Sequence, residues 1–239
     1  MEGLVFRRME QKYILNETQR QALEALLDQR MEPDKFARSS IRNIYYDTPD
    51  YRLIRRSLEK PSVYKEKLRL RSYGDIAAGG DVFLEMKKKY KGVVYKRRVA
   101  IGESQAERYM ADVAEKLDAG QIGREIDYFK TFYRQLRPAM YLSYDRRSWR
   151  GEDSLRITLD WNVCYRTQNL SLSAPPGGEQ LLEPGQYLLE VKTATAIPLW
   201  LTAFLSQQKI FKQSFSKYGT AYLRLLEANK IESGGFRYA

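Results

Sequence analysis

Hydrophobic and polar residues alternate along much of the chain, and this pattern predicts β-strands with one apolar and one polar face. The strands are expected at residues 6–15, 42–47, 63–73, 82–86 and onward, 93–101, 139–149, 155–166 and 187–192. Apolar residues at helical spacing predict five helices, at residues 17–29, 104–117, 124–136, 198–209 and 216–229. Asn16 is a suitable cap for the first helix, and Ser104 with Glu107 predicts a capping box for the second. Residues 171–185 are rich in Pro, Gly and Ser and predict an exposed loop.

These elements indicate an α+β fold in a single domain that spans residues 1–239. We expect eight antiparallel strands to form a closed barrel flanked by about five helices. The charged face of each strand lies opposite its apolar face, so the helices should cover the outside and leave a polar interior. Small barrels usually fill their interior with apolar side chains, and a charged lumen stays open only around ligand, ions and water.

Four cations stand at every second position of one predicted strand: Lys65, Lys67, Arg69 and Arg71. Alternate residues of a strand share a face, so these like charges would lie side by side and repel each other. The arrangement is favourable if a polyanion lies against that face.

Other predicted strands carry polar groups in the same period of two. The positions that share a face are Glu10 and Lys12; Glu85, Lys87 and Lys89; Lys96 and Arg98; Tyr144 and Arg146; Arg156, Thr158 and Asp160; and Glu190 and Lys192. A single strand of this kind could simply expose a charged face to solvent. Repetition along the chain favours one shared basic lumen. Glu10, Glu85 and Glu190 are then either ion-pair partners or ligands of Mg²⁺ or Mn²⁺.

The composition restricts the partners and the catalytic groups that this protein can use. A net charge of +11 indicates an anionic partner, such as nucleic acid, a phosphate compound or a membrane surface. The absence of histidine excludes Ser-His-Asp and Cys-His triads, and the single cysteine excludes a disulfide framework. The two common glycine-rich phosphate-binding motifs, GxxxxGK[ST] and GxGxxG, are both absent from the sequence. With no apolar run of about 20 residues and no signal-peptide pattern, we expect a cytoplasmic protein without membrane insertion.

Seven short motifs, in order along the chain, resemble those of a known family. They are Glu10-Gln11-Lys12-Tyr13, Tyr45-Tyr46-Asp47-Thr48, Lys67-Leu68-Arg69-Leu70-Arg71-Ser72-Tyr73-Gly74, Phe83-Leu84-Glu85-Met86-Lys87, Leu155-Arg156-Ile157-Thr158-Leu159-Asp160, Leu189-Glu190-Val191-Lys192 and Phe215-Ser216-Lys217-Tyr218. The chain is similar to the VTC domain, the polyphosphate polymerase domain of the vacuolar transporter chaperone family, in the triphosphate tunnel metalloenzyme superfamily. The resemblance covers residues from about 6 to about 225.

The resemblance implies transfer of the γ-phosphoryl group of ATP to a growing polyphosphate chain, with Mn²⁺ or Mg²⁺ as cofactor. It assigns phosphate binding at the catalytic centre to Lys12, Arg69, Arg71, Lys87, Lys96, Arg146, Arg156 and Lys217. Further substrate contacts are expected from Lys65, Lys67, Arg98, Tyr144, Lys192 and Ser216. Metal binding is expected at Glu190, with Glu85 and Glu10 as further candidates.

Two departures from the family pattern bear on this assignment. Ser214 stands where the family often has a basic residue, and Lys212 is the nearby candidate to replace it. The first strand lacks the ExExK carboxylate pair of other tunnel enzymes, which favours the VTC branch over the triphosphatases.

Two alternatives to the polymerase remain at this point: a triphosphatase of the same fold, and a non-catalytic module that binds polyanions. We do not expect nucleic acid as a partner, because many tyrosines fall at apolar positions rather than at positions suited to base stacking. Translocation of the product would require a separate membrane partner protein.

Overall fold

One antiparallel sheet organises the computed structural model, which describes residues 9–61, 63–74, 80–194 and 196–232. Its strands are β1 (Met9–Leu15), β2 (Glu32–Asp47), β3 (Tyr64–Tyr73), β4 (Asp81–Tyr90), β5 (Val93–Gly102), β6 (Arg137–Arg150), β7 (Arg156–Arg166), β8 (Glu179–Gln180) and β9 (Tyr187–Thr193). They pair in the order β1-β9-β7-β6-β2-β3-β4-β5, with the short β8 beside β7. The mixed helical and antiparallel architecture agrees with the sequence prediction.

The sheet curls strongly, so that side chains of the edge strand β1 approach those of β4, which lies next to the other edge. Glu10 on β1 and Lys87 on β4 lie close enough for each to shift the pKa of the other. Among the described residues, however, no hydrogen-bonded ladder joins β1 to β5. The described sheet is therefore open along this seam, and the closed barrel expected from the sequence is not confirmed.

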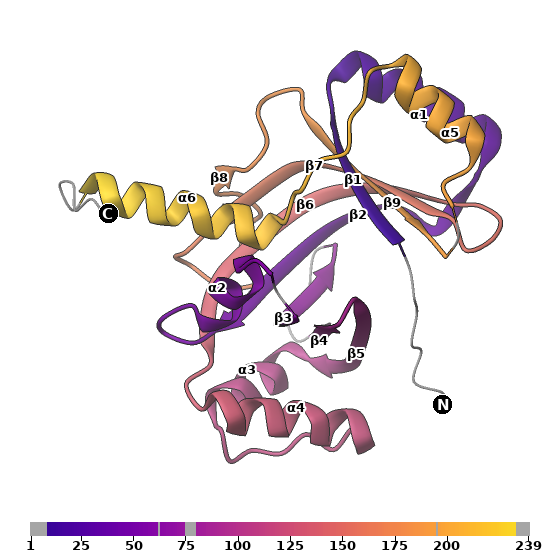
Figure 1. Cartoon of the computed structure of the whole chain (residues 1–239). Helices are drawn as coiled ribbons and strands as arrows, with labels where there is room; N and C mark the ends of the chain where they lie inside the picture. The colour runs from indigo at the N-terminus through magenta and orange to yellow at the C-terminus, as the bar shows by residue number, and fades with distance from the viewer. Residues whose placement is uncertain (1–8, 62, 75–79, 195, 233–239) are drawn as a thin grey trace.

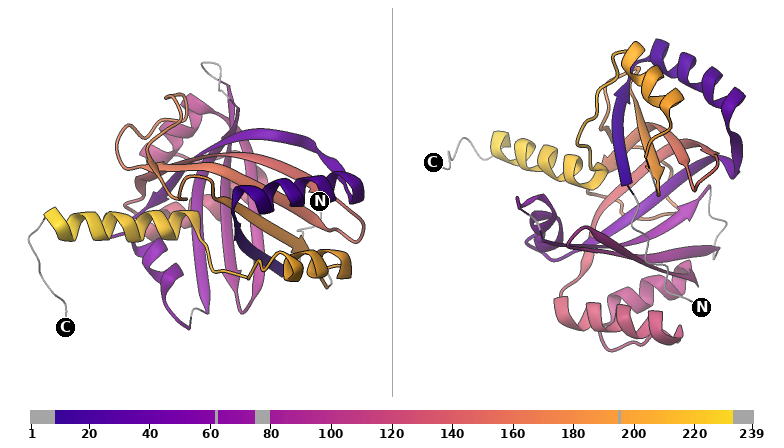
Figure 2. Two further views of the ribbon diagram at one scale, coloured as in Figure 1. Left: turned by 90° about the horizontal axis from the view of Figure 1, so that it is seen from above. Right: turned by 45° about the vertical axis from the view of Figure 1, so that its right-hand side comes forward.

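Four of the six described helices cover the outside of the curved sheet, in two groups (Figures 1 and 2). The six helices are α1 (Glu17–Arg30), α2 (Arg52–Leu58), α3 (Glu103–Ala111), α4 (Gly120–Tyr133), α5 (Leu199–Gln207) and α6 (Lys217–Glu232). Leu23 and Leu27 of α1 and Leu201 of α5 pack on apolar residues of β1, β7 and β9. Tyr109 of α3 and Phe129 of α4 pack on β2, β3 and β4. The polar face of each strand consequently points to the opposite side.

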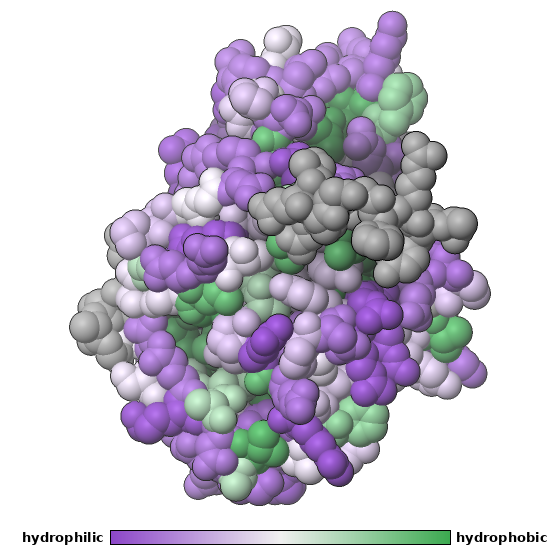
Figure 3. Space-filling model, turned by 90° about the vertical axis from the view of Figure 1, so that its left-hand side faces the viewer, coloured by the Kyte–Doolittle hydropathy of each residue, from purple (hydrophilic) through white to green (hydrophobic). Residues whose placement is uncertain are grey.

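The remaining two helices, α2 and α6, pack against that opposite side. Ile54 of α2 and Tyr218 of α6 join a buried cluster with Tyr45, Met140 and Leu188 of the sheet. Beyond this contact α6 projects away from the sheet (Figure 2). The face from which it projects is mainly hydrophilic, with hydrophobic side chains in scattered spots (Figure 3).

The sequence pattern did not predict α2, because its start is stabilised by a residue of the preceding strand. The buried Asp47 carboxylate accepts hydrogen bonds from the backbone N–H groups of Leu53 (2.8 Å) and Ile54 (3.0 Å). It also accepts one from the Tyr218 hydroxyl (2.8 Å), which ties α2 to α6. These bonds satisfy amides that the helix itself leaves without partners.

Several predicted boundaries differ from the observed ones. The Asn16 cap is confirmed, and Gln19 completes a capping box. The box at Ser104 and Glu107 is wrong, because α3 already begins at Glu103 and has no side-chain cap. Strand β2 is much longer than predicted, and β8 lies within the expected loop. Residues 6–8 of the first predicted strand lie outside the described residues. None of the described helices has the length and apolar character needed to span a membrane.

Candidate functional site

The polar face of the sheet, opposite α1, α3, α4 and α5, is called the inner face below. The strand register can be followed across it, because residues that lie opposite each other in a ladder share a face. Lys12 lies opposite Glu190, Arg146 opposite Asp160, and Arg69 opposite Glu85. The expected alternation is confirmed on β3, where Leu68 and Leu70 are buried on the outer side. Side chains from distant segments are thus gathered on one surface.

Glu85 is the centre of the first charged cluster. Its carboxylate is almost fully buried and accepts hydrogen bonds from Arg69 (2.7 and 2.9 Å) and Arg98 (2.7 Å). Lys96 lies 3.0 Å away and Arg71 3.6 Å away. Burial alone would raise the pKa of Glu85, but these four cations outweigh it and hold the pKa well below its usual range.

Asp160 and Glu190 form the second cluster. Both Asp160 oxygens accept hydrogen bonds from Arg146 (2.6 and 2.7 Å), and Lys217 approaches one of them at 2.5 Å. Glu190 lies 3.0 Å from Lys192, 3.4 Å from Lys217, 3.6 Å from Lys12 and 3.8 Å from Arg146. Burial would raise the pKa of both carboxyl groups, but the surrounding cations lower it. Both groups are therefore ionised at neutral pH.

The start of α6 reaches this cluster. Lys217 is the first residue of the helix, and the preceding Ser216 accepts hydrogen bonds from Gly219 N–H and from Lys67 Nζ, both at 3.2 Å. Lys12 Nζ donates to the carbonyl oxygen of Phe215 at 2.8 Å. A helix N-terminus flanked by lysines attracts anions, because its dipole and its free N–H groups favour negative charge.

Lys67 and Tyr45 join the two clusters. Burial lowers the pKa of Lys67 to about 8, since the neutral amine is easier to bury than the ammonium. Burial raises the pKa of Tyr45, but Arg69, Lys67 and Arg71 outweigh it and lower the pKa to about 8. The Tyr45 hydroxyl accepts a hydrogen bond from Arg69 at 2.9 Å. The Tyr45 hydroxyl thus experiences a strongly positive potential.

Positive charge is in excess at the centre of the inner face. Its central cations are Lys12, Lys67, Arg69, Arg71, Lys87, Lys96, Arg98, Arg146, Lys192 and Lys217. The carboxylates among these cations are Glu10, Glu85, Asp160 and Glu190. Such an excess favours a ligand with several negative charges.

A family model, the VTC domain, matches residues 7–226 of the chain. The chain belongs to the VTC domain family. This membership agrees with the resemblance of the seven sequence motifs.

Solved structures share the fold of this VTC domain. A proposed adenylate cyclase from Bacillus halodurans is 14% identical, with a TM-score of 0.56, and the match covers 90% of this chain and 96% of that chain. A proposed adenylate cyclase from Vibrio parahaemolyticus is also 14% identical, with a TM-score of 0.50, over 92% of this chain and 99% of that chain. A comparison with curated proteins found no match.

Most of the residues expected from the VTC motifs lie together, but some lie at the ends of the inner face. Arg156 is half-exposed and pairs with Asp34 at 2.8 Å, away from the central clusters. Lys65 donates to the carbonyl oxygen of Ser57 (2.7 Å) at the end of α2, and it lies opposite Lys89. Tyr144 is central, where its hydroxyl accepts from Arg71 at 3.4 Å.

The position of Lys212 argues against its use as a replacement for the missing basic residue at Ser214. Lys212 lies opposite Tyr13, whose ring packs in the outer core with α1 and α5. Its side chain therefore lies on the outer side. The Lys67 ammonium group instead contacts the Ser216 hydroxyl, so β3 supplies a positive charge beside the motif at residues 215–218.

The sequence analysis gave no role to several residues that the structure places in the site. Asp160 was recognised by its alternation with Arg156 but was not assigned a role. Asn43 accepts a hydrogen bond from Arg71 Nε at 2.9 Å. Neutral side chains such as Asn43 and Tyr45 give no charge signal, although their period of two on β2 could have indicated a shared face.

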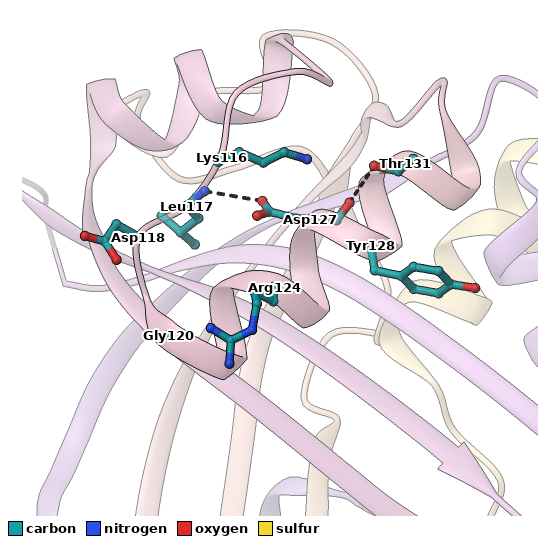
Figure 4. Close-up of a pocket in the computed structure, with 8 residues that line it drawn as sticks. All are labelled: Lys116, Leu117, Asp118, Gly120, Arg124, Asp127, Tyr128 and Thr131. Carbon is teal, nitrogen blue, oxygen red and sulfur yellow. Dashed lines mark hydrogen bonds between the residues drawn. The ribbon is translucent and has the colours of Figure 1, made fainter.

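A surface hollow of about 610 Å³ lies outside the inner face, between the segment before α4 and α4 itself (Figure 4). Its lining residues are Lys116, Leu117, Asp118, Gly120, Arg124, Asp127, Tyr128 and Thr131. Asp127 accepts from the backbone N–H of Leu117 (3.3 Å) and from the Tyr109 hydroxyl (2.7 Å), and its carbonyl oxygen accepts from Thr131 (2.9 Å). The bonds from Leu117 and Tyr109 to Asp127 hold the segment before α4 against that helix. The hollow therefore results from the packing of this segment on α4.

Proposed function

We propose that this VTC domain is a metal-dependent polyphosphate polymerase, which transfers the γ-phosphoryl group of ATP to a polyphosphate chain. The observation that carries the proposal is the centre of the inner face, where cations outnumber carboxylates and hold the buried Glu85, Asp160 and Glu190 in the ionised form. The proposal treats residues 1–239 as one functional domain. Membership of the VTC domain family supports the proposed polymerase activity.

Phosphoryl transfer depends mainly on positioning and on neutralising charge at the transferring group. Arg69, Arg71 and Arg146 can each bind two phosphate oxygens in fixed geometry, whereas lysines act as point charges. Lys217 and Ser216 would bind a phosphate group at the start of α6. The other cations of the inner face, including Lys87, Lys96 and Lys192, would neutralise the rest of the polyphosphate chain.

The surroundings of the carboxylates favour transfer over hydrolysis. A hydrolase needs a base to activate water, and a carboxylate whose pKa is strongly lowered is a weak base. Glu85, Asp160 and Glu190 all have lowered pKa values. A terminal phosphate is already ionised at neutral pH and can attack without a base.

A divalent metal fits the inner face if it enters together with phosphate. The described side chains contain no cluster of three ligating groups, and Mg²⁺ is commonly held by one or two carboxylates plus substrate phosphates. Glu190 would hold the metal, with Glu10 nearby. The Thr158 hydroxyl, opposite Glu190, is buried without a hydrogen-bond partner among the described residues and could bind a ligand atom. The metal would neutralise charge on phosphate oxygens. The four cations around Glu85 lie at 2.7–3.6 Å, closer than the 3.0–3.8 Å of those around Glu190, which favours an ion-pair role for Glu85.

The test is incubation of the purified chain with ATP and Mn²⁺ or Mg²⁺, followed by gel electrophoresis of the products. We expect a ladder of acid-labile polymer together with ADP. Release of orthophosphate from ATP or inorganic triphosphate without polymer would instead identify a triphosphatase. Binding without turnover would identify a polyanion-binding module.

Neighbouring lysines supply a matched control. Lys87 lies on the inner face, whereas Lys88 pairs with Glu66 on the outer side at 3.7 Å. We expect Lys87→Ala, Arg69→Ala and Lys217→Ala to lower the polymerase rate at least about 10-fold, and Lys88→Ala to leave it nearly unchanged. Full activity in Arg69→Ala and Lys217→Ala would refute the site assignment. Export of the polymer would require a membrane partner protein.

A further inference from the structure

Two aromatic rings occupy one end of the inner face. Tyr73 follows Arg71 in the period of two on β3, and Phe83 of β4 lies directly opposite Arg71. The rings meet edge to face, with centroids 5.7 Å apart and planes at 74°. Beyond the phosphate-binding cations, the inner face therefore ends in an aromatic surface.

This surface is accessible and is bordered by guanidinium groups. Tyr73 is 41% exposed. The Arg98 guanidinium lies 4.2 Å from the centre of the Phe83 ring and 5.4 Å from that of Tyr73. The Tyr73 hydroxyl accepts hydrogen bonds from Arg98 and from Arg71. Aromatic rings and guanidinium planes both stack against nucleobases.

The opposite end of the same strands is different. Tyr64 and Tyr90 are also exposed and in edge contact, but they lie on the outer side, where Tyr64 bonds to Glu66. On the inner face of that end, Lys65 lies opposite Lys89. The inner face thus runs from an aromatic and arginine-rich end to a lysine-rich end. Neither inorganic phosphate chains nor metal ions have an apolar part that would require the aromatic end.

We propose that Tyr73, Phe83 and Arg98 form the platform for the nucleobase of the nucleotide substrate. This inference rests on the proposed function and adds a direction to it. The base stacks at the Tyr73 end, the triphosphate extends past Arg71 and Arg69 toward Lys67, and the polymer leaves toward Lys65 and Lys89. A nucleoside triphosphate is the donor class that uses the whole length of this face.

Substitution of the rings tests the platform in the full chain. Equilibrium binding of a non-hydrolysable ATP analogue and of inorganic tripolyphosphate is measured for Tyr73→Leu and Phe83→Leu. We expect each variant to bind the ATP analogue about 5- to 100-fold more weakly, as loss of base stacking predicts. Tripolyphosphate, which has no base, should bind as in the unsubstituted chain, and this also shows that the site is folded.

Two control variants separate the ring from its other contacts. Tyr73→Phe keeps the ring and loses only the hydroxyl, so it should retain affinity for the ATP analogue. Tyr90→Leu removes an equally exposed ring from the outer side and should change neither ligand. Equal weakening of the ATP analogue and tripolyphosphate in both leucine variants, or no weakening of the ATP analogue in either, overturns the platform.

A measurement on the unsubstituted chain gives an independent answer. The fluorescence of 2-aminopurine riboside triphosphate should fall on binding, because stacking quenches this base, and excess tripolyphosphate should restore it. Binding without quenching overturns the proposal. Because these assays detect binding, the platform can stand even if no polymer forms, and polymer can form even if the platform is wrong.

Discussion

Replacement of Glu85 by glutamine tests the view that this carboxylate is the counter-ion of the inner face. The substitution keeps the shape of the side chain and removes one negative charge from among Arg69, Arg71, Lys96 and Arg98. Removing one partner of a buried ion pair costs about 3–5 kcal/mol, because the remaining charge is left without compensation. Lys96 and Arg98 are 49% and 35% exposed, so solvent screens their share. We expect a loss of about 3 kcal/mol in the free energy of unfolding.

Thermal unfolding measures this loss, which should lower the Tm by about 6–12 °C for a chain of this size. Inorganic tripolyphosphate should restore much of it, because phosphate oxygens can replace the missing carboxylate beside the same cations. Its stabilising effect should therefore be larger in Glu85→Gln than in the unsubstituted chain.

The pH dependence provides a second readout. The cations hold the pKa of Glu85 below the usual 4.5. A lowered pKa in the folded state contributes stability above pH 4.5, and this contribution is lost as the pH falls toward the folded pKa. The stability difference between the unsubstituted chain and Glu85→Gln should consequently shrink on acidification below pH 4.5.

Glu125→Gln is the matched control. Glu125 pairs with Arg97 on the outer side at 3.0 Å, where both side chains are partly exposed. Its loss should cost less than about 1 kcal/mol. A Glu85→Gln variant as stable as this control, or one that tripolyphosphate stabilises no more than the unsubstituted chain, would contradict the counter-ion role.

Two further predictions follow from buried polar groups. Burial lowers the pKa of Lys67 to about 8, so its positive charge is lost as the pH rises through that value. Calorimetric titration should show tripolyphosphate affinity falling several-fold between about pH 7 and about pH 9. The Lys67→Arg variant should lack the part of this decrease that comes from Lys67, because arginine stays charged. An identical pH profile in the variant would exclude Lys67 as the titrating group. Asp47→Ala should lower the free energy of unfolding by about 2–4 kcal/mol, because it leaves the first amides of α2 and the Tyr218 hydroxyl without their acceptor. In chemical denaturation the exposed Asp50→Ala should cost less than about 1 kcal/mol, and equal losses in both variants would refute the special role of Asp47.

The strands and their charged faces could be predicted from the sequence because alternation is a local property of the backbone. Lys65, Lys67, Arg69 and Arg71 do share one face of β3, as their spacing alone predicts. The family motifs could also be recognised without a structure. The helices α1 and α5 follow from local apolar periodicity, and the Asn16 cap from a residue type with a known preference.

Contacts between distant segments were decided only by the tertiary structure. The pairing of Lys217 with Asp160, and of Lys67 with Ser216, depends on where α6 crosses the curved sheet. No local pattern contains this information, because strand register and sheet curvature result from packing across the whole chain. The same reason explains why α2 was missed, since its capping carboxylate belongs to β2. The sequence by itself determined which charged residues of each predicted strand share a face. The fold decided which charges meet there, which ones remain uncompensated, and that one end of the inner face is aromatic.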